Sequence, residues 1–441
     1  MVKENGRGGT DVSAAAGFLR IGTRRELRAQ RAAELETGST SVSRVLIIVQ
    51  NLPVPFDRRV WLECQALVSA GHHVAVVCPK ADGDPGYAVL DSVQLYKYRA
   101  YAPGGSKVGF VTEYVYSFAA TLWLTLLARR GGRFAVVQAC NPPDIFWPIA
   151  LLLRIMDRTA FVFDHHDLCP ELYESRFPDG PRLPHRVLLM LERRTFRAAS
   201  RVISTNESYR EIAVIRGGKA RADVTVVRTG PDTNRLVRGD QRPELRRGRE
   251  FLAAYIGVMG PQDGVDIVVR AAAILVHERN RHDIAFTLIG SGDCYDALVK
   301  LRDELDLAGH VEFTGRISDG KVAEILSTAD VGLSPDPLNP LNDLSTMNKT
   351  MEYMAYELPV VAFDLRETRV SAGDAAVYVA PNDVAEYASA IARLVDDESL
   401  RATLGKKGRA RVESDLAWSY QEHAYLNAYH RVLGATGLGG A

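Results

Sequence analysis

The segment DHHDLCPE, from Asp164 to Glu171, places three acidic residues and two histidines within eight positions. Imidazole and carboxylate groups can act as a general base, bind an acceptor hydroxyl or ligate a metal, and structural hydrogen bonding is the alternative without chemistry. The spacing matches no standard zinc signature. The sequence therefore favours direct substrate contact through His165, His166 and Asp167.

A second candidate is the segment STMNKTMEYMAYELPVVAFD, residues 345–364, which opens an expected helix. Lys349 and Glu352 alone would be an exposed i,i+3 ion pair of small energetic value. However, the preceding loop SPDPLNPLND is rigid, with three prolines. If Ser345 or Thr346 is the N-cap, the first-turn N–H groups face an anion together with Lys349. This arrangement favours a phosphate site.

Two further segments could bind a charged ligand. FDRR sets Arg58 and Arg59 at an expected strand–helix junction. Arg59 with Glu63, four residues later, could equally be a plain surface pair. IGSGD ends a strand on Gly290 and Gly292, where backbone could approach a phosphate or simply turn tightly.

The elements that must position these residues alternate regularly. Two apolar runs, RVLIIVQNL (44–52) and HVAVVCP (73–79), are typical of buried strands, and the segment between them is typical of a helix. This order predicts a parallel sheet covered on both faces. A second series begins at FLAAYIGVMG (251–260). The sequence predicts two tandem Rossmann-like, doubly wound α/β domains facing a central cleft. The expected divisions are a flexible tail (1–43), a first domain (44–235), a linker (236–250), a second domain (251–415) and a terminal helix packing back across the junction (416–441).

Composition excludes several classes of protein. The chain has 441 residues, and its 54 basic residues balance its 54 acidic ones, so nucleic acid is not an expected partner. Its five cysteines are scattered without a CxxC pair, as in reduced cytosolic proteins. We find no secretory signal and no membrane span. The apolar segments 114–130 and 145–156 are either buried helices or a contact with a bilayer surface.

Several motifs in order resemble glycosyltransferase family 4, whose members are retaining enzymes of the GT-B fold. They are AGHHVAVV, VVRTGPD, IGVMGPQDGVD, LIGSGD with VEFTGRI, and NKTMEYMAYELPVVAFD, covering about residues 44–433. The resemblance implies a nucleoside-diphosphate sugar as co-substrate, UDP or GDP, with no metal and no other cofactor. It implies a sugar or lipid-linked acceptor, as in the subgroup that builds bacterial polysaccharides, and a cytoplasmic enzyme, peripheral at the inner face of the membrane if 114–130 contacts it.

The resemblance also assigns roles to residues of the second domain. Glu352 matches the second acid of the family's E-x7-E pair and would bind the ribose hydroxyls, whereas the first acid falls at Leu344. The usual basic diphosphate clamp falls at Val258 and Asp263. We therefore hypothesise that Lys349 and the helix N-terminus replace this clamp. The full expected donor set is Glu352, Lys349, Asn348, Thr346, Ser345, Arg316, Gly260, Gly290 and Gly292.

In the first domain, His166 loosely matches the family histidine near the transferred sugar, and His165 is an alternative. Arg58, Arg59 and Glu171 are the expected acceptor-side residues. The family mechanism is same-face displacement without an enzyme nucleophile. Two rivals remain, namely a nucleotide-sugar epimerase on the same fold and an inactive sugar-nucleotide-binding relic.

One departure from the family concerns backbone strain. Glu357 stands where the family usually has glycine after the helix. If this residue is left-handed, the side chain costs roughly 1 kcal/mol.

Overall fold

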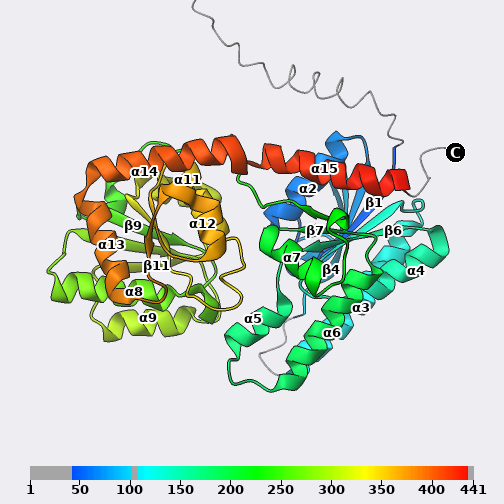
Figure 1. Ribbon diagram of the computed structural model, residues 1–441, viewed down its shortest axis with the longest axis horizontal. Helices are drawn as coiled ribbons and strands as arrows, with labels where there is room; N and C mark the ends of the chain where they lie inside the picture. The colour runs from blue at the N-terminus through cyan, green and yellow to red at the C-terminus, as the bar shows by residue number, and fades with distance from the viewer. Residues whose placement is uncertain (1–41, 102–106, 436–441) are drawn as a thin grey trace, which may run out of the picture. The chain divides into compact units, whose positions relative to one another are not determined.

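The computed structural model describes residues 42–101 and 107–435. The expected N-terminal tail thus lies almost wholly outside the described residues. The described chain forms two separate sheets (Figure 1). One has eight strands and the other has six. This confirms the prediction of two doubly wound α/β sheets.

The first sheet has the order β3-β4-β2-β1-β5-β6-β7-β8. Strand β3 is antiparallel to β4, an edge pairing that the sequence did not predict, and the other pairings are parallel. Chain order reverses between β1 and β5, and ligands of such sheets bind near that point, beyond the carboxyl ends of the strands. The strands are β1 (Arg44–Ile48), β2 (His73–Lys80), β3 (Tyr87–Leu90), β4 (Val93–Arg99), β5 (Val136–Cys140), β6 (Ala160–His165), β7 (Arg201–Ser204) and β8 (Val224–Val226).

Helices cover both faces of the first sheet. One face packs against α2 (Arg58–Ser69) and α15 (Trp418–Ala435). The other packs against α3 (Lys107–Arg129), α4 (Trp147–Asp157), α6 (Arg182–Ala198) and α7 (Glu207–Ile215). The short α5 (Cys169–Arg176) follows β6. Asp57 caps α2 by accepting a hydrogen bond from the backbone N–H of Val60.

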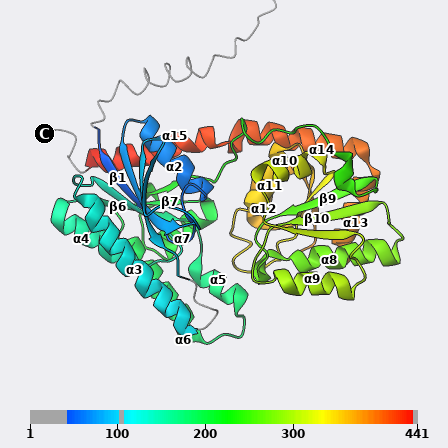
Figure 2. The ribbon, with the colours of Figure 1, turned by 180° about the vertical axis from the view of Figure 1, so that it is seen from behind.

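The second sheet is entirely parallel, with the order β11-β10-β9-β12-β13-β14. Its strands are β9 (Phe251–Ile256), β10 (Ile284–Ile289), β11 (Val311–Gly315), β12 (Val331–Ser334), β13 (Val360–Phe363) and β14 (Ala376–Val379). Strands β9 and β10 are labelled in Figure 2. Helices α8 (Val265–Ala273), α9 (Tyr295–Glu304) and α13 (Val384–Asp396) pack on one face. Helices α10 (Asp319–Thr328), α11 (Asn348–Ala355) and α12 (Arg366–Ala372) pack on the other, and α14 (Glu398–Arg411) follows α13.

Two segments of chain join the sheets. The outgoing segment, around residues 227–250, contains a short 3-10 helix (Pro243–Arg246) and is tied to α10 by hydrogen bonds from backbone N–H groups to Ser327 and Thr328. The returning segment leads from α14 into α15, which completes the core of the first sheet. The two segments touch at Gly230, where a Cβ would lie 2.1 Å from the carbonyl oxygen of Leu416, so only glycine fits.

Candidate active site

The first cluster lies at the carboxyl end of β6, where Asp164 is fully buried. Arg59 reaches it from the first turn of α2, and its NH2 group donates to Asp164 Oδ1 at 3.0 Å. The same guanidinium lies 3.1 Å from Glu63 Oε1 and donates to the carbonyl oxygen of Val227 at 2.9 Å. Arg59 is only 6% exposed, so the reading of Arg59 and Glu63 as a surface pair is wrong.

The charges in this cluster balance. Burial favours the neutral acid of Asp164, but Arg59 and His166 outweigh it and hold the pKa of Asp164 below its usual range. Burial and the neighbouring Asp164 charge raise the pKa of Glu63 well above its usual range. We therefore assign an ionised Asp164, a protonated Glu63 and one compensating guanidinium.

His166 follows β6 and is the histidine that reaches the surface, with its side chain 15% exposed. Its Nε2 lies 2.6 Å from Oδ2 of Asp164. Because that carboxylate only accepts, Nε2 carries the proton and Nδ1 keeps the lone pair. Arg59 Nε lies 2.9 Å from the same nitrogen and 3.1 Å from Oε1 of Glu63. The backbone N–H of His166 donates to Asn141 Oδ1 at 2.7 Å.

The prediction that His165 contacts substrate is wrong. Its ring is fully buried among Phe163, Phe196 and Tyr209. Burial, followed by the charge of Arg216, lowers the pKa of His165 to about 3, so the imidazole is neutral at physiological pH. Successive strand residues point to opposite faces of a sheet, which places His165 away from its neighbour Asp164.

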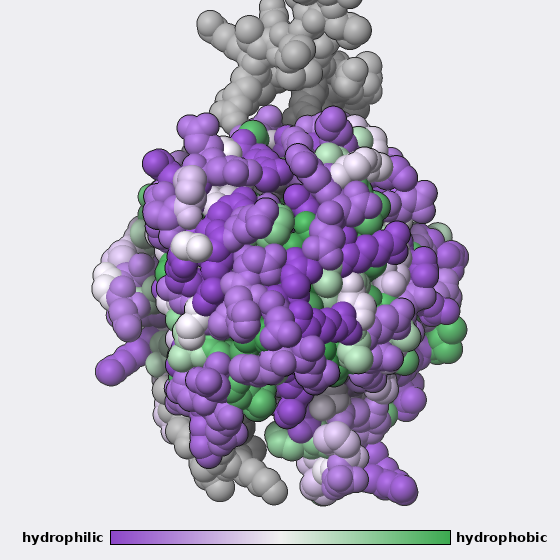
Figure 3. Space-filling model, turned by 90° about the vertical axis from the view of Figure 1, so that its left-hand side faces the viewer, coloured by the Kyte–Doolittle hydropathy of each residue, from purple (hydrophilic) through white to green (hydrophobic). Residues whose placement is uncertain are grey.

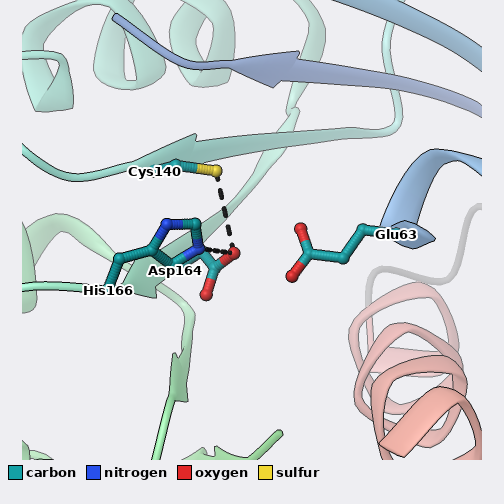
Figure 4. Close-up of side chains that lie close together, drawn as sticks. All are labelled: Glu63, Cys140, Asp164 and His166. Carbon is teal, nitrogen blue, oxygen red and sulfur yellow. Dashed lines mark hydrogen bonds and ion pairs between the residues drawn. The ribbon is translucent and has the colours of Figure 1, made fainter. Parts of the chain in front are cut away.

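Together with Cys140 at the end of β5, three side chains of this cluster form a group that could ligate a metal. Ligand atoms of Glu63, Cys140, Asp164 and His166 all lie within 4.8 Å of one another (Figure 4). However, the guanidinium of Arg59 already compensates the charge of Asp164, and Glu63 is protonated. Burial, followed by the Asp164 charge, also raises the pKa of the Cys140 thiol well above its usual range, whereas a metal needs the thiolate. The residues therefore fit an internal ion pair better than a cation site.

The remaining first-domain candidates lie in different surroundings. Glu171 forms an ion pair with Arg216, which also binds Glu192. The backbone of Asp167 makes two hydrogen bonds with the side-chain amide of Asn141. Its N–H donates to Oδ1, and its carbonyl oxygen accepts from Nδ2. Burial raises the pKa of the Asp167 carboxyl.

The second cluster surrounds Lys349, the second residue of α11. Its ammonium pairs with Asp336, which follows β12, and lies 5.2 Å from the ring centroid of Tyr255. Burial opposes protonation, but Asp336 and Asp263 outweigh it and raise the pKa of Lys349. The interpretation of Lys349 and Glu352 as an exposed pair is therefore wrong.

Lys349 also lies beside the turn that lacks the family clamp. A Cβ built on Gly257, the first residue of that turn, would be 3.3 Å from Lys349 Cε. The side chain of Asp263 in the same turn accepts from the backbone N–H of Gly260 at 2.9 Å. The lysine is thus brought close to the segment where the expected basic residues are replaced by Val258 and Asp263.

The expected N-cap is also wrong. Helix α11 begins at Asn348 after Met347, with no side-chain cap. Ser345 instead bonds to Tyr209 OH at 2.9 Å, and Thr346 Oγ1 accepts from Asn206 Nδ2 at 3.0 Å. These hydroxyls therefore tie the loop before α11 to α7.

Leu344, at the position of the missing family acid, belongs to an apolar contact between the same elements. It packs with Leu341 against Leu168 and Tyr209. Asn206 also donates to the carbonyl oxygen of Leu344 at 2.9 Å. A carboxylate at position 344 would lose this apolar packing. The leucine that stands in place of the family acid therefore has a packing role.

Glu352 lies on α11 with its side chain 22% exposed and faces Arg58 at 3.5 Å. Arg58 is in turn held by Asp319, at 2.7 Å. Burial raises the pKa of Glu352, which Arg58 partly counteracts. Arg58 was expected on the acceptor side, and the structure places it against Glu352, an expected donor residue.

The three expected donor glycines mainly permit close backbone packing. A Cβ on Gly290 would lie 1.8 Å from the carbonyl oxygen of Gly257, and one on Gly292 would lie 2.6 Å from that of Met259. A Cβ on Gly260 would meet the amide of Gln262 at 2.8 Å. These contacts join the turns after β9 and β10, which favours the tight-turn alternative.

Arg316 is exposed at the end of β11 and lies over the ring of Phe56, 5.0 Å from its centroid. Three residues of these clusters were not predicted from the sequence, namely Gln138, Asn206 and Tyr209. Asn206 was detectable as an N-cap residue before α7, but Gln138 sits inside an apolar strand and offered no signal.

Two family profiles match the chain. The profile described as "Glycosyltransferase Family 4" matches residues 57–235, and that described as "Glycosyl transferases group 1" matches residues 250–397. D-inositol 3-phosphate glycosyltransferase from Mycobacterium tuberculosis is 28% identical over 270 residues, which are 58% of this chain and 53% of that protein. The chain thus spans about half the length of the curated relatives that it matches.

Solved structures share the two-sheet fold. A sucrose-phosphate synthase from Thermosynechococcus elongatus superposes with a TM-score of 0.73 at 18% identity, covering 89% of this chain and 100% of that one. HepE from Anabaena in complex with UDP-glucose gives a TM-score of 0.65 at 15% identity, covering 88% and 100%. At these identities the likeness shows the fold alone.

Proposed function

Because the chain belongs to glycosyltransferase family 4 and has the GT-B fold, we propose that it is a retaining enzyme that moves a sugar from a nucleoside-diphosphate sugar to an acceptor hydroxyl. The supporting observation is that Lys349 and Glu352 flank the turns of the second sheet while His166 follows β6 of the first. Both clusters lie at the carboxyl ends of parallel strands, where such sheets bind ligands. UDP or GDP is the nucleotide we propose, and HepE is described with UDP-glucose.

In this proposal the second sheet holds the donor. The leaving nucleoside diphosphate gains negative charge, which must be neutralised as the glycosidic bond breaks. The ammonium of Lys349 has three N–H donors, and its ion pair with Asp336 uses one of them. The others, with the free N–H groups at the start of α11, are available to phosphate oxygens. Glu352 accepts from the ribose hydroxyls.

The first sheet contributes His166. Its Nε2–H is committed to Asp164, so Nδ1 presents a lone pair to a sugar hydroxyl. The imidazole thereby orients the transferred sugar while the acceptor oxygen attacks from the face that the diphosphate leaves.

Donor binding and turnover test the proposal directly. A thermal-shift screen with UDP, GDP, ADP and dTDP should show stabilisation by one nucleotide, since a ligand of the folded state raises its stability. Sugar transfer should require an acceptor and should be lost in His166→Ala. Turnover of the donor without acceptor would indicate an epimerase, and absence of nucleotide binding by calorimetry would indicate an inactive relic.

We further propose that the acceptor is lipid-linked and that α3 rests on the membrane, in an enzyme of cell-surface polysaccharide or glycolipid assembly. The buried side of helix α3 includes Ser117, Thr121 and Thr125, each at most 1% exposed, together with apolar side chains that pack on the first sheet. Its outer side carries Val115 and Trp123, which are 65% and 64% exposed. Large apolar side chains turned outward favour an apolar surrounding.

Helix α6, on the same face of the first sheet, adds positive charge. A surface cavity of about 330 Å³ is lined by Arg186, Leu189, Met190, Arg193, Arg194 and Arg197. Leu183 beside it is 71% exposed. Arginines flanking exposed apolar residues suit a leaflet containing anionic lipids. In contrast, the face over α8 and α13 is mainly hydrophilic (Figure 3).

No helix among the described residues is long and apolar enough to cross a membrane. The contact we propose is a peripheral one through the outer side of α3. The protein should float with vesicles of phosphatidylcholine and phosphatidylglycerol and bind less to phosphatidylcholine alone. Trp123→Ser with Leu127→Ser should abolish flotation, whereas Val370→Ser on α12 should not. Unchanged flotation of the α3 variant would contradict the membrane role.

A further inference from the structure

Gln138, in the middle of β5, connects the C-terminal helix to the first cluster. Its side chain is fully buried. Its Oε1 accepts hydrogen bonds from the hydroxyls of Tyr425 at 2.9 Å and Tyr429 at 2.6 Å. Its Nε2 donates to Glu63 Oε2 at 2.7 Å and to Asp164 Oδ2 at 3.0 Å. All four hydrogen-bonding positions of the amide are thus used.

These contacts fix the orientation of the amide. The two tyrosine hydroxyls can donate to an oxygen, and the ionised Asp164 can only accept. If the amide flipped, its nitrogen would face two hydroxyls and its oxygen would face two carboxyl groups. The ionised Asp164 therefore determines which end of the amide faces it, and the two hydroxyls of α15 bind the opposite end, Oε1.

Asp164 in turn determines the state of His166. Its Oδ1 receives Arg59, and its Oδ2 receives both Gln138 and His166. The hydrogen bond at Oδ2 is the one that keeps the proton on Nε2 and leaves Nδ1 free. If the Asp164 carboxylate were displaced, the proton of His166 would no longer be held on Nε2.

We propose that Gln138 is a positioning residue through which the hydroxyls of Tyr425 and Tyr429 hold Asp164 and thereby orient the imidazole of His166. The inference rests on the proposed role of His166 in sugar transfer. Because α15 follows α14 along the chain, a helix connected to the second sheet thus sets the geometry of His166 beside the first sheet. The alternative is that these hydrogen bonds only stabilise the core and do not affect catalysis.

The decisive variant is Tyr425→Phe with Tyr429→Phe, which keeps both rings and removes both hydroxyls. We expect kcat to fall roughly tenfold with little change in the KM for the donor, since donor contacts are unaltered. Tyr387→Phe is the matched control, because its buried hydroxyl donates to the carbonyl oxygen of Val361 in the second sheet, at 3.2 Å. Tyr420→Phe controls for α15 itself, since Tyr420 is 49% exposed.

A double-mutant cycle with Gln138→Met tests the order of the chain of contacts. Gln138→Met should lower kcat by a similar factor, and adding both tyrosine substitutions should cause little further loss, because residues acting in series are not additive. Additive losses would overturn the proposal. Circular dichroism and unfolding measurements identify any variant that does not fold. If Gln138→Met does not fold, the double variant Tyr425→Phe with Tyr429→Phe, which keeps both rings, still tests the proposal.

Nitrogen-15 NMR of the imidazoles gives a second measurement, independent of turnover. The His166 resonances, assigned by their loss in His166→Gln, should report Nε2 protonation in the unsubstituted protein and a mixed tautomer in the tyrosine pair. If these resonances and kcat stay unchanged in the tyrosine pair while His166→Ala abolishes turnover, the positioning proposal fails and the proposed function stands. If the resonances shift but His166→Ala retains turnover, the positioning stands and the role of His166 fails.

Discussion

Lys349 at the start of α11 is ion-paired with Asp336 after β12, and their side chains are only 10% and 3% exposed. A lysine in a first helical turn would ordinarily extend into solvent. Here it is turned toward the turn after β9, and a second carboxyl group, that of Asp263, also acts on it. The pair holds one ammonium beside the region where we propose that the diphosphate binds.

Replacing Lys349 by methionine should impair both folding and turnover. The lost ion pair leaves Asp336 buried without its partner and should lower the free energy of unfolding by about 3 kcal/mol. Loss of the ammonium should lower kcat/KM by more than roughly tenfold. Lys349→Met with Asp336→Asn should recover most of the stability but not the turnover. Recovery of both would show that the lysine is only structural.

Replacing Glu352 by glutamine should weaken nucleotide binding. A carboxylate accepts from two ribose hydroxyls more strongly than an amide, so we expect the Kd for the nucleotide to rise about tenfold in calorimetry. Glu324→Gln on α10, whose carboxylate pairs with Lys321 at the surface, is the control. An unchanged Kd in Glu352→Gln would exclude the ribose role.

Replacing Asp144 by asparagine should reduce the loss of stability at high pH. Burial, and then the charge of Glu192, raise the pKa of Asp144 to about 7, and the side chain is 3% exposed. A carboxyl group that binds its proton more tightly when folded contributes stability below its unfolded pKa, and this contribution is lost as pH rises toward 7.

Between pH 5 and pH 8 the unsubstituted protein should therefore lose stability, and Asp144→Asn should lose less, gaining about 1–3 kcal/mol at pH 8. Glu192, whose pKa burial also raises to about 7, should leave part of the slope in place. Urea unfolding at each pH measures this, with exposed Asp179→Asn as the control. Parallel pH profiles for Asp144→Asn and the unsubstituted protein would contradict the prediction.

Replacing Glu357 by glycine should stabilise the protein. Its φ of 55° lies in the left-handed region, as expected if it replaces the family glycine. Relief of this strain should raise the free energy of unfolding by roughly 1 kcal/mol. Glu357→Ala keeps a Cβ and should give no such gain in thermal unfolding. Equal stabilities for the glycine and alanine variants would rule out strain at this position.

The sequence predicted the architecture well because its signals are local. Solid apolar runs separated by helical segments specify buried parallel strands, and the ligand edge then follows from topology. Prediction failed where a side chain serves a distant partner. Ser345 and Thr346 were expected to cap α11, but Tyr209 and Asn206, far away in the sequence, bind them instead.

Residue types and short spacings were enough to predict the two sheets, the resemblance to the family and the segments that carry Lys349, Glu352 and His166. In contrast, the folded structure was needed to show that His165 is buried while His166 reaches the surface, and that Lys349 binds Asp336. It alone brought Gln138 between α15 and Asp164. The physical reason is that burial and hydrogen-bond partners arise from contacts between distant segments, which no local pattern encodes.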